Sequence, residues 1–399
     1  MDATTFDPTA PLPGPPDPWA STDEPSPRAG PPFHMTEMIA AEPSLAERIA
    51  ARSTAPDSPT RALAARIAAT VRAGRPVVVT GCGTSEHGAI AVAEILREAV
   101  PGGAALIWSA QAFELSLDAP ASGLVIGISH EGATGATNAA LAAARAAGAA
   151  TALITASDRS PGAALADIVV ATEELDQSWC HTVGYVSPIT VAATVAGHLT
   201  GSAPDPTALG GLLRSGLSEV AAGQAVEIAA GLAGLGRILV LGSGADRAAG
   251  RELVLKVEEG TWLPAAYRDL ETFLHGHLAA TEATTGVIAI ATDRRDRDER
   301  LARLRGALSA ARVIGMPTAA IVSGDADQSI PAELTNLGRI VVDAGPAQVP
   351  AAVAALLSSA TALQTLTERL ARARNVNPDA IHRDVARYRE AAEAAEVAS

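Results

Sequence analysis

Lysine is almost absent from this chain of 399 residues, and cysteine and aromatic residues are scarce. Arginine fills every other basic Lys/Arg position, and the one lysine, Lys256, lies in the stretch RELVLKVEEG at 251–260. The lysine could remain by chance, or because it forms an exposed ion pair with a glutamate on the same helix. Arginine would form such a pair equally well. A task that needs a compact ammonium group rather than a planar guanidinium does not accept arginine. Lys256 is therefore a candidate site residue.

Other absences exclude classes of function. The net charge is −14 without a basic cluster, which argues against a nucleic-acid partner. No apolar run approaches the roughly 20 residues of a membrane span, and no leader-type apolar segment opens the chain. The two cysteines, Cys82 and Cys180, are far apart and form no CxxC pair. We therefore expect reduced thiols in a cytoplasmic protein, with no membrane partner, no metal site and no cofactor.

The chain divides into segments of different composition. Residues 1–35 are rich in proline and lack aliphatic periodicity, which predicts a disordered arm. Two amphipathic helices follow, over 36–53 and 58–74. Short apolar runs such as PVVVTG (76–81) and GLVIGIS (123–129) then alternate with helical segments. This alternation predicts an α/β protein whose parallel sheets carry helices on both faces.

The α/β pattern occurs twice. RILVLGSG (237–244) repeats the outline of PVVVTGCG (76–83), and a helical pattern follows each Gly-x-Gly. This repeated pattern indicates an internal duplication. The predicted domains are a first domain with its N-terminal helices, a helical linker, a second domain, and a C-terminal tail over the active site, at 36–202, 203–235, 236–372 and 373–399.

Two polar loops at predicted strand ends carry the signs of an anion site. GCGTSEHG (81–88) and SHEGAT (129–134) each lead into a helix, where backbone N–H groups and hydroxyls bind phosphate. Ser85, Ser129 and Thr134 supply the hydroxyls, and Gly83 allows close approach. The alternative is that these hydroxyls are ordinary helix N-caps. The glycine pattern does not fit a dinucleotide site, and no P-loop lysine is present.

The duplicated sheet, the GTS turn and the Ser-x-x-Gly-x-Thr loop resemble the sugar isomerase (SIS) domain family, and within it the isomerase half of glutamine–fructose-6-phosphate transaminase. The resemblance covers roughly residues 38 to 385. It implies two tandem SIS domains, each a flavodoxin-like three-layer sandwich. It also implies that the turn, the loop and residue 182 bind a sugar phosphate. The residues concerned are Gly83, Thr84 and Ser85 in the turn, Ser129, His130, Glu131 and Thr134 in the loop, and Thr182. Around Thr182, a pocket wall and a buried core cluster are equally good interpretations.

The lone lysine falls on a second motif of that family. ELVLKVEE matches a helix with Glu-x-x-x-Lys-x-x-Glu, so the resemblance makes Glu259 the base that moves a proton between C1 and C2, with Glu252 and Lys256 beside it. These three positions also share one helical face by spacing alone. FLHGHL supplies His275, which the resemblance links to ring opening, often across a dimer. A homodimer with its active site near the subunit interface is therefore expected.

The resemblance is incomplete at three points. No glutaminase segment precedes the first lobe, so we do not expect glutamine to supply ammonia. His130 and Glu131 replace the family's Gln and Ser, and a carboxylate beside a phosphate weakens phosphate binding. The tail, NVNPDAIHRDVARYR (375–389), contains no lysine to form an imine.

The sequence thus predicts an aldose–ketose isomerase acting on a sugar phosphate or amino-sugar phosphate, with or without deamination. Two alternatives stay open at this stage. The first is a non-catalytic regulator that binds sugar phosphates, and the second is an isomerase of an unphosphorylated sugar-like substrate, which Glu131 favours.

Overall fold

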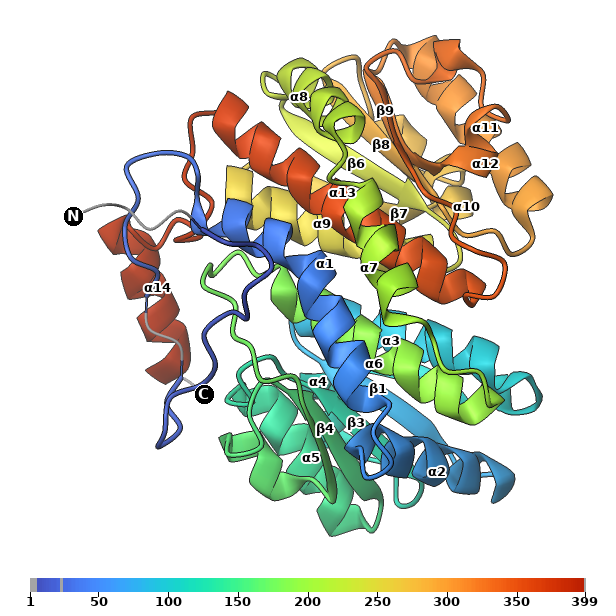
Figure 1. Cartoon of the computed structure of the whole chain (residues 1–399). Coiled ribbons are helices and arrows are strands. Elements are labelled where there is room, and N and C mark those ends of the chain that lie inside the picture. Colours follow the sequence, from blue (N-terminus) through green and yellow to red (C-terminus); the bar gives the residue numbers. More distant parts are fainter. Residues whose placement is uncertain (1–5, 22–23, 398–399) are drawn as a thin grey trace.

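The computed structural model describes residues 6–21 and 24–397, and it contains two α/β lobes, each built on a parallel five-stranded sheet (Figure 1). The first sheet has the order β2-β1-β3-β4-β5. Its strands are β1 (Val77–Gly81), β2 (Ile107–Gln111), β3 (Leu124–Ile128), β4 (Ala150–Thr155) and β5 (Ile168–Ala171). The second sheet has the order β10-β9-β8-β6-β7. Its strands are β6 (Arg237–Gly242), β7 (Ala265–Asp269), β8 (Thr285–Ala291), β9 (Thr318–Ser323) and β10 (Gly338–Val342).

The two sheets have the same topology. Read from β7, the second order is the first order repeated strand for strand, and all pairs in both sheets are parallel. This confirms the predicted fold class of two tandem α/β domains.

Helices cover both faces of each sheet (Figure 1). Those around the first sheet are α2 (Pro59–Arg72), α3 (Thr84–Ala99), α4 (Ala112–Leu117), α5 (Gly135–Ala147) and α6 (Val183–Thr200). Those around the second are α8 (Glu219–Leu232), α9 (Asp246–Thr261), α10 (Leu270–Leu274), α11 (Arg297–Ile314) and α12 (Gly324–Asp327). The remaining helices are α1 (His34–Ser53), α7 (Pro206–Ser215), α13 (Ala351–Ala373) and α14 (Ala386–Val397). Short 3₁₀ turns occur at Pro101–Leu106, Pro161–Leu165, His277–Ala280 and Ala332–Leu334.

Apolar residues on both faces of the strands explain this layering. In β1, Val77 and Val79 join the core beneath α3 and α6, whereas Val78 joins the core beneath α4 and α5. In β6, Ile238 and Leu239 divide in the same way between two cores. Side chains alternate across a strand, so a continuous apolar run fills both faces of a sheet.

One helix belongs to both lobes. Val353 and Leu357 of α13 lie in the first-lobe core, whereas Leu366 and Leu370 lie in the second-lobe core. Figure 1 shows α13 crossing between the lobes. The segment predicted as a linker also packs on both lobes. Leu209 of α7 lies in the first-lobe core, and Ile228 of α8 lies in the second-lobe core. The sequence predicted the linker as helical but not the cores that its helices fill.

The described part of the proline-rich segment differs from the disordered arm predicted from composition. Leu12 is buried, its N–H donates to Glu174 Oε2 at 2.8 Å, and Arg48 of α1 pairs with the same carboxylate. The N–H of Leu175 donates to the carbonyl of Pro13. Backbone hydrogen bonds hold this segment on the first lobe, and they leave no trace in composition or periodicity. Residues 1–5 and 22–23 of the predicted arm lie outside the described residues.

Glu98 of α3 holds the start of α13. Its two carboxylate oxygens accept the N–H groups of Ala351 and Ala352 at 2.8 and 2.7 Å. These groups lack partners within the helix, and a carboxylate at a helix N-terminus is favourable.

We predict that Glu98→Gln lowers the free energy of unfolding by about 1.5–3 kcal/mol, the usual range for hydrogen bonds to charged groups. Urea denaturation of the variant and of Glu227→Gln, an exposed control on α8, measures this. Equal unfolding free energies for the two variants would show that Glu98 does not hold α13.

Candidate functional site

Three charged residues meet on the inner face of α9. The side chains of Lys256 and Glu252 are fully buried, and that of Glu259 is 23% exposed. Lys256 Nζ lies 2.6 Å from Glu259 Oε2 and 3.6 Å from Glu252 Oε1. The spacing along the helix predicted this common face, and the lysine stands between two carboxylates.

The protonation of these groups follows from burial and mutual charge. Burial alone would lower the pKa of Lys256, but Glu259 and Glu252 outweigh it and raise that pKa above its ordinary value. Burial pushes the pKa of Glu252 up, but Lys256 and a hydrogen bond from His87 bring it below the ordinary value. The pKa of Glu259 is raised by burial, which Lys256 offsets only in part. A carboxylate with a raised pKa is suited to general-base work near neutral pH.

The first lobe meets this cluster with the N-terminal turn of α3. His87 Nδ1 lies 2.8 Å from Glu252 Oε2, and Thr84 Oγ1 lies 3.5 Å from Glu252 Oε1. Glu252, buried at the contact between the lobes, thus accepts from α3 and pairs with Lys256. Thr84, predicted as a substrate contact, faces this carboxylate.

The two loops predicted to bind an anion leave the sheet next to each other. Strands β1 and β3 are hydrogen-bonded neighbours, so the 81–85 turn and the 129–134 loop start at the same edge. Ser129 is buried, and its hydroxyl donates to Thr134 Oγ1 at 3.3 Å. Neither α3 nor α5 has a side-chain N-cap hydrogen bond, so these hydroxyls do not act as N-caps. The Ser129 proton is used in the bond to Thr134, and the Thr134 hydroxyl still has its own proton to donate.

The turn before α3 has room for a ligand. Gly83 has φ = +56°, and a Cβ built on it would meet only Leu255, at 3.9 Å. Ser85 is half-buried in the first turn of α3. The glycine is therefore required for its backbone conformation rather than by crowding.

His130 has a partner inside the protein. Its Nε2 accepts the N–H of Asp176 at 2.9 Å, and its ring lies edge-on to His181 at 5.5 Å between centroids. Burial, followed by the charge of His181, lowers the pKa of His130 to about 4. Its neighbour Glu131 is half-buried. His130 thus stays neutral and fixes the 176–182 segment.

The segment 176–182 is organised by the Asp176 carboxylate, which accepts from the N–H groups of Ser178, Thr182 and Val183. Thr182 is buried and its hydroxyl has no partner among the described residues. Cys180 packs with Met35 and other apolar residues. The core interpretation therefore applies to Cys180, whereas a pocket wall at Thr182 stays a prediction.

His275 does not reach the cluster within one chain. Its side chain is 74% exposed, and its Nε2 lies 3.1 Å from Glu271 of the same helical turn. No hydrogen bond joins it to α9 in the described part of the chain.

The C-terminal tail does pass close to α9. Pro378 would lie 3.3 Å from a Cβ at Gly260, the residue after Glu259. Asp379 accepts the N–H groups at the start of α1, and His382 stacks between Trp262 and Tyr388. The tail is therefore fastened beside the cluster without a lysine.

The profile of the SIS domain matches residues 71–200 and 231–330, one segment in each lobe and together more than half of the chain. The chain belongs to the SIS domain family. No curated protein matches the chain in sequence.

Solved structures share the fold of both SIS lobes. One is the C-terminal domain of glucosamine-fructose-6-phosphate aminotransferase from Francisella tularensis, with a TM-score of 0.75 and 16% identity over 89% of this chain and 99% of that one. Another is tagatose-6-phosphate ketose/aldose isomerase from Escherichia coli, with a TM-score of 0.70 and 18% identity over 90% and 98%. A third, glucosamine-6-phosphate deaminase from Thermotoga maritima, has a TM-score of 0.58 and 16% identity over 87% and 96%.

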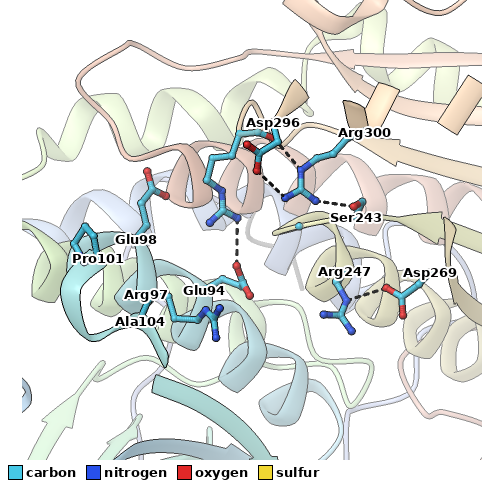
Figure 2. A pocket seen from close by; sticks show the side chains of 12 residues that line it. Glu94, Arg97, Glu98, Pro101, Ala104, Ser243, Arg247, Asp269, Asp296 and Arg300 are labelled. Atoms are coloured by element: carbon cyan, nitrogen blue, oxygen red, sulfur yellow. Dashed lines mark hydrogen bonds and ion pairs between the residues drawn. The ribbon is translucent and has the colours of Figure 1, made fainter. Parts of the chain in front are cut away.

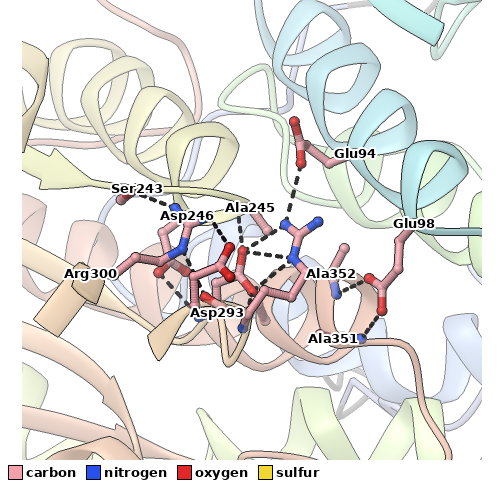
Figure 3. Close-up of polar contacts among 12 residues, drawn as sticks. Glu94, Glu98, Ser243, Ala245, Asp246, Asp293, Arg300, Ala351 and Ala352 are labelled. Carbon is pink, nitrogen blue, oxygen red and sulfur yellow. Dashed lines mark hydrogen bonds and ion pairs between the residues drawn. The ribbon is translucent and has the colours of Figure 1, made fainter. Parts of the chain in front are cut away.

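In the second SIS lobe a carboxylate closes the turn that corresponds to the one at Gly83 (Figure 3). Asp293 Oδ2 accepts the N–H of Ala245 at 2.8 Å just before α9, and Arg295 pairs with that carboxylate at 2.6 Å. A Cβ built on Gly244, the counterpart of Gly83, would lie 2.3 Å from Asp293 Oδ2. The first lobe has an open turn at this place, whereas the second carries its own carboxylate there.

A cavity of about 840 Å³ lies between the lobes beside this closed turn (Figure 2). Its charged lining residues are Glu94, Arg97, Glu98, Arg247, Asp269, Arg295, Asp296 and Arg300. Arginines and carboxylates are equal in number there, and Arg247 pairs with Asp269 while Arg295 pairs with Glu94. The charges of this cavity are thus paired with one another. We place the candidate site at the first lobe and α9 because the open turn at Gly83 and the buried Lys256 lie there.

Sequence reasoning missed His87 and Asp176. His87 lies four residues after Gly83, one helical turn into α3. This spacing was the signal that would have placed it near the first-lobe turn. Its partner Glu252 is 165 residues away, and nothing in the sequence pairs the two. In the described residues no cluster of three or more His, Cys, Asp or Glu side chains could hold a metal ion, and no helix is long and apolar enough to cross a membrane.

Asp246 provides a test of the second-lobe charges. It is buried, and burial followed by the charge of Asp293 raises its pKa to about 6. Because the folded pKa lies above the unfolded value, the stabilising protonated form is fully present below about pH 4 and is lost as the pH rises through 6. We predict that the unfolding free energy of the wild type, relative to Asp246→Asn, falls by roughly 3 kcal/mol between pH 4 and 7.

Denaturant titrations at several pH values measure this difference, with Asp57→Asn, an exposed aspartate, as the control. Parallel pH profiles for the wild type and Asp246→Asn would refute a raised pKa at this residue.

Proposed function

We propose that the chain is an aldose–ketose isomerase of a sugar phosphate or amino-sugar phosphate, with Glu259 as the base. The observation that carries this proposal is the buried Lys256 ammonium between Glu252 and Glu259, opposite the open first-lobe turn. The names of the solved structures with this fold, which include a ketose/aldose isomerase and a deaminase, agree with it.

The proposed chemistry is a proton transfer between adjacent carbons. The Glu259 carboxylate removes a proton from C2 of the aldose or C1 of the ketose, and the same group returns it to the neighbouring carbon. The Lys256 ammonium, held charged by its two carboxylates, stabilises the negative charge that develops on O1 and O2. Isomerisation followed by loss of ammonia uses the same first step for an amino sugar.

A catalytic role accounts better than simple binding for the charges on α9. Burying three ionised groups costs free energy that apolar residues would not cost. Such costs recur where a reaction needs perturbed pKa values. This supports an enzyme over a non-catalytic sugar-phosphate regulator.

The substrate phosphate would bind at the 129–134 loop and the first turn of α3. Ser129 and Thr134 supply hydroxyls that are not used as helix caps, and Ser85 adds a third. Glu131 of the same loop has no cationic partner among the described residues. That unpaired carboxylate favours the second candidate function, isomerisation of an unphosphorylated sugar.

A thermal-shift screen separates the two candidates. If the phosphate binds here, sugar phosphates stabilise the protein, by about 2.7 kcal/mol at a hundredfold excess over Kd, and their unphosphorylated parents do not. Ser129→Ala then shows a weaker shift with an unchanged melting temperature in the absence of ligand. Equal shifts by both ligand classes would support the unphosphorylated substrate instead.

Glu259→Gln should lower kcat by roughly 10²–10⁴-fold with little change in KM, as expected for loss of a general base. The matched control is Glu258→Gln. Glu258 is exposed and accepts the N–H of Ala265, so this control should keep its turnover. Full turnover by Glu259→Gln on a substrate that the wild type converts would remove the isomerase assignment.

The homodimer expected from the family remains a prediction, and it bears on His275. Because this side chain is exposed and forms no hydrogen bond or ion pair with α9 among the described residues, we expect it to contribute to a site only through a neighbouring subunit.

A further inference from the structure

His87 stands at the contact between the lobes with only one of its ring nitrogens engaged. Its side chain is 14% exposed, and Nδ1 lies 2.8 Å from Oε2 of the fully buried Glu252. In the described structure Nε2 has no hydrogen-bond partner. The ring is thus oriented by one nitrogen and open at the other.

The charge of Glu252 decides which nitrogen carries the proton. The pKa of Glu252 lies below its ordinary value, because Lys256 and the His87 bond outweigh burial. An ionised carboxylate only accepts hydrogen bonds, so Nδ1 donates its N–H. The neutral ring therefore has its lone pair on Nε2. A carboxylate that fixes the tautomer of a histidine in this way prepares the second nitrogen for proton transfer.

His87 on the first lobe is linked to Glu259 on the second lobe through Glu252 and Lys256. Glu252 bonds to His87 with one oxygen and faces Lys256 with the other, and Lys256 pairs with Glu259.

The other histidines near the cluster are less suited to proton transfer. His130 uses Nε2 to accept the N–H of Asp176. Burial and the charge of Lys256 lower the pKa of His181 to about 4, which makes this ring a weak base. His275 lies on the surface beside Glu271.

We propose that His87 is a catalytic residue that opens the sugar ring. Its Nε2 takes the proton from the anomeric hydroxyl while the bond between the anomeric carbon and the ring oxygen breaks. The carbonyl forms, and the imidazolium returns a proton to the ring oxygen. The step is neutral overall and needs no further reactant. It rests on the proposed isomerase function, and it delivers the open-chain sugar to Glu259 at the same site.

The test compares a cyclic substrate with one that cannot close. The probes are the ketohexose 6-phosphate that the wild type converts and its 5-deoxy analogue, which lacks the hydroxyl that closes the ring. His87→Asn keeps an amide N–H to donate to Glu252 but has no basic nitrogen. We expect its kcat to fall roughly 10²–10⁴-fold on the cyclic substrate and less than about threefold on the analogue.

Three further variants complete the experiment. His87→Gln also lacks a basic nitrogen and replaces His87→Asn if that protein does not fold. His87→Ala loses the donor to Glu252 as well, so it should be slow on both substrates. His198→Asn, a half-buried histidine on α6 that bonds to Ser53 and Thr60, is the control.

Equal losses on both substrates for His87→Asn would make His87 a positioning residue for Glu252 and overturn ring opening. Full activity of this variant on the cyclic substrate would overturn any catalytic role. Failure of the wild type on every cyclic and open-chain probe would instead overturn the proposed function, and ring opening with it.

Discussion

The contact between Lys256 and its two carboxylates is the constraint on which the arrangement of the lobes depends. A buried ammonium between Glu252 and Glu259 is tolerated only if each charge has a partner. The first lobe completes this set, because His87 donates to the remaining oxygen of Glu252. The lobes are therefore joined by packing and also by a shared set of charges that neither lobe satisfies alone.

The shared helix α13 holds this contact in place. It contributes to both hydrophobic cores, and Glu98 of α3 caps its first turn. Both ends of α3 therefore contact the second lobe or the shared helix. Its N-terminal turn contacts Glu252, and its C-terminal end binds the start of α13. The duplicated lobes diverged at their strand ends. The turn at Gly83 stayed open, whereas Asp293 closed the equivalent turn at Gly244.

The fold was largely predictable because its signals are local. Apolar runs such as PVVVTG and the repeated Gly-x-Gly predicted two parallel sheets, and the spacing of residues 252, 256 and 259 predicted one helical face. The pairing of His87 with Glu252, the role of α13 in two cores and the closure of the second turn by Asp293 involve residues far apart in sequence. The contacts of the described part of the proline-rich segment, such as the hydrogen bond from the Leu12 N–H to Glu174, are not encoded in composition.

The most direct test of the central claim is a crystal structure with an open-chain hexitol 6-phosphate, which mimics the linear form of a sugar phosphate. We expect C1 and C2 of the ligand beside Glu259 and Lys256, its O1 or O2 within hydrogen-bonding distance of Nζ, and its phosphate at the 129–134 loop. A ligand bound instead in the cavity lined by Arg247 and Arg300, or in no part of the contact between α3 and α9, would contradict the assignment of this site.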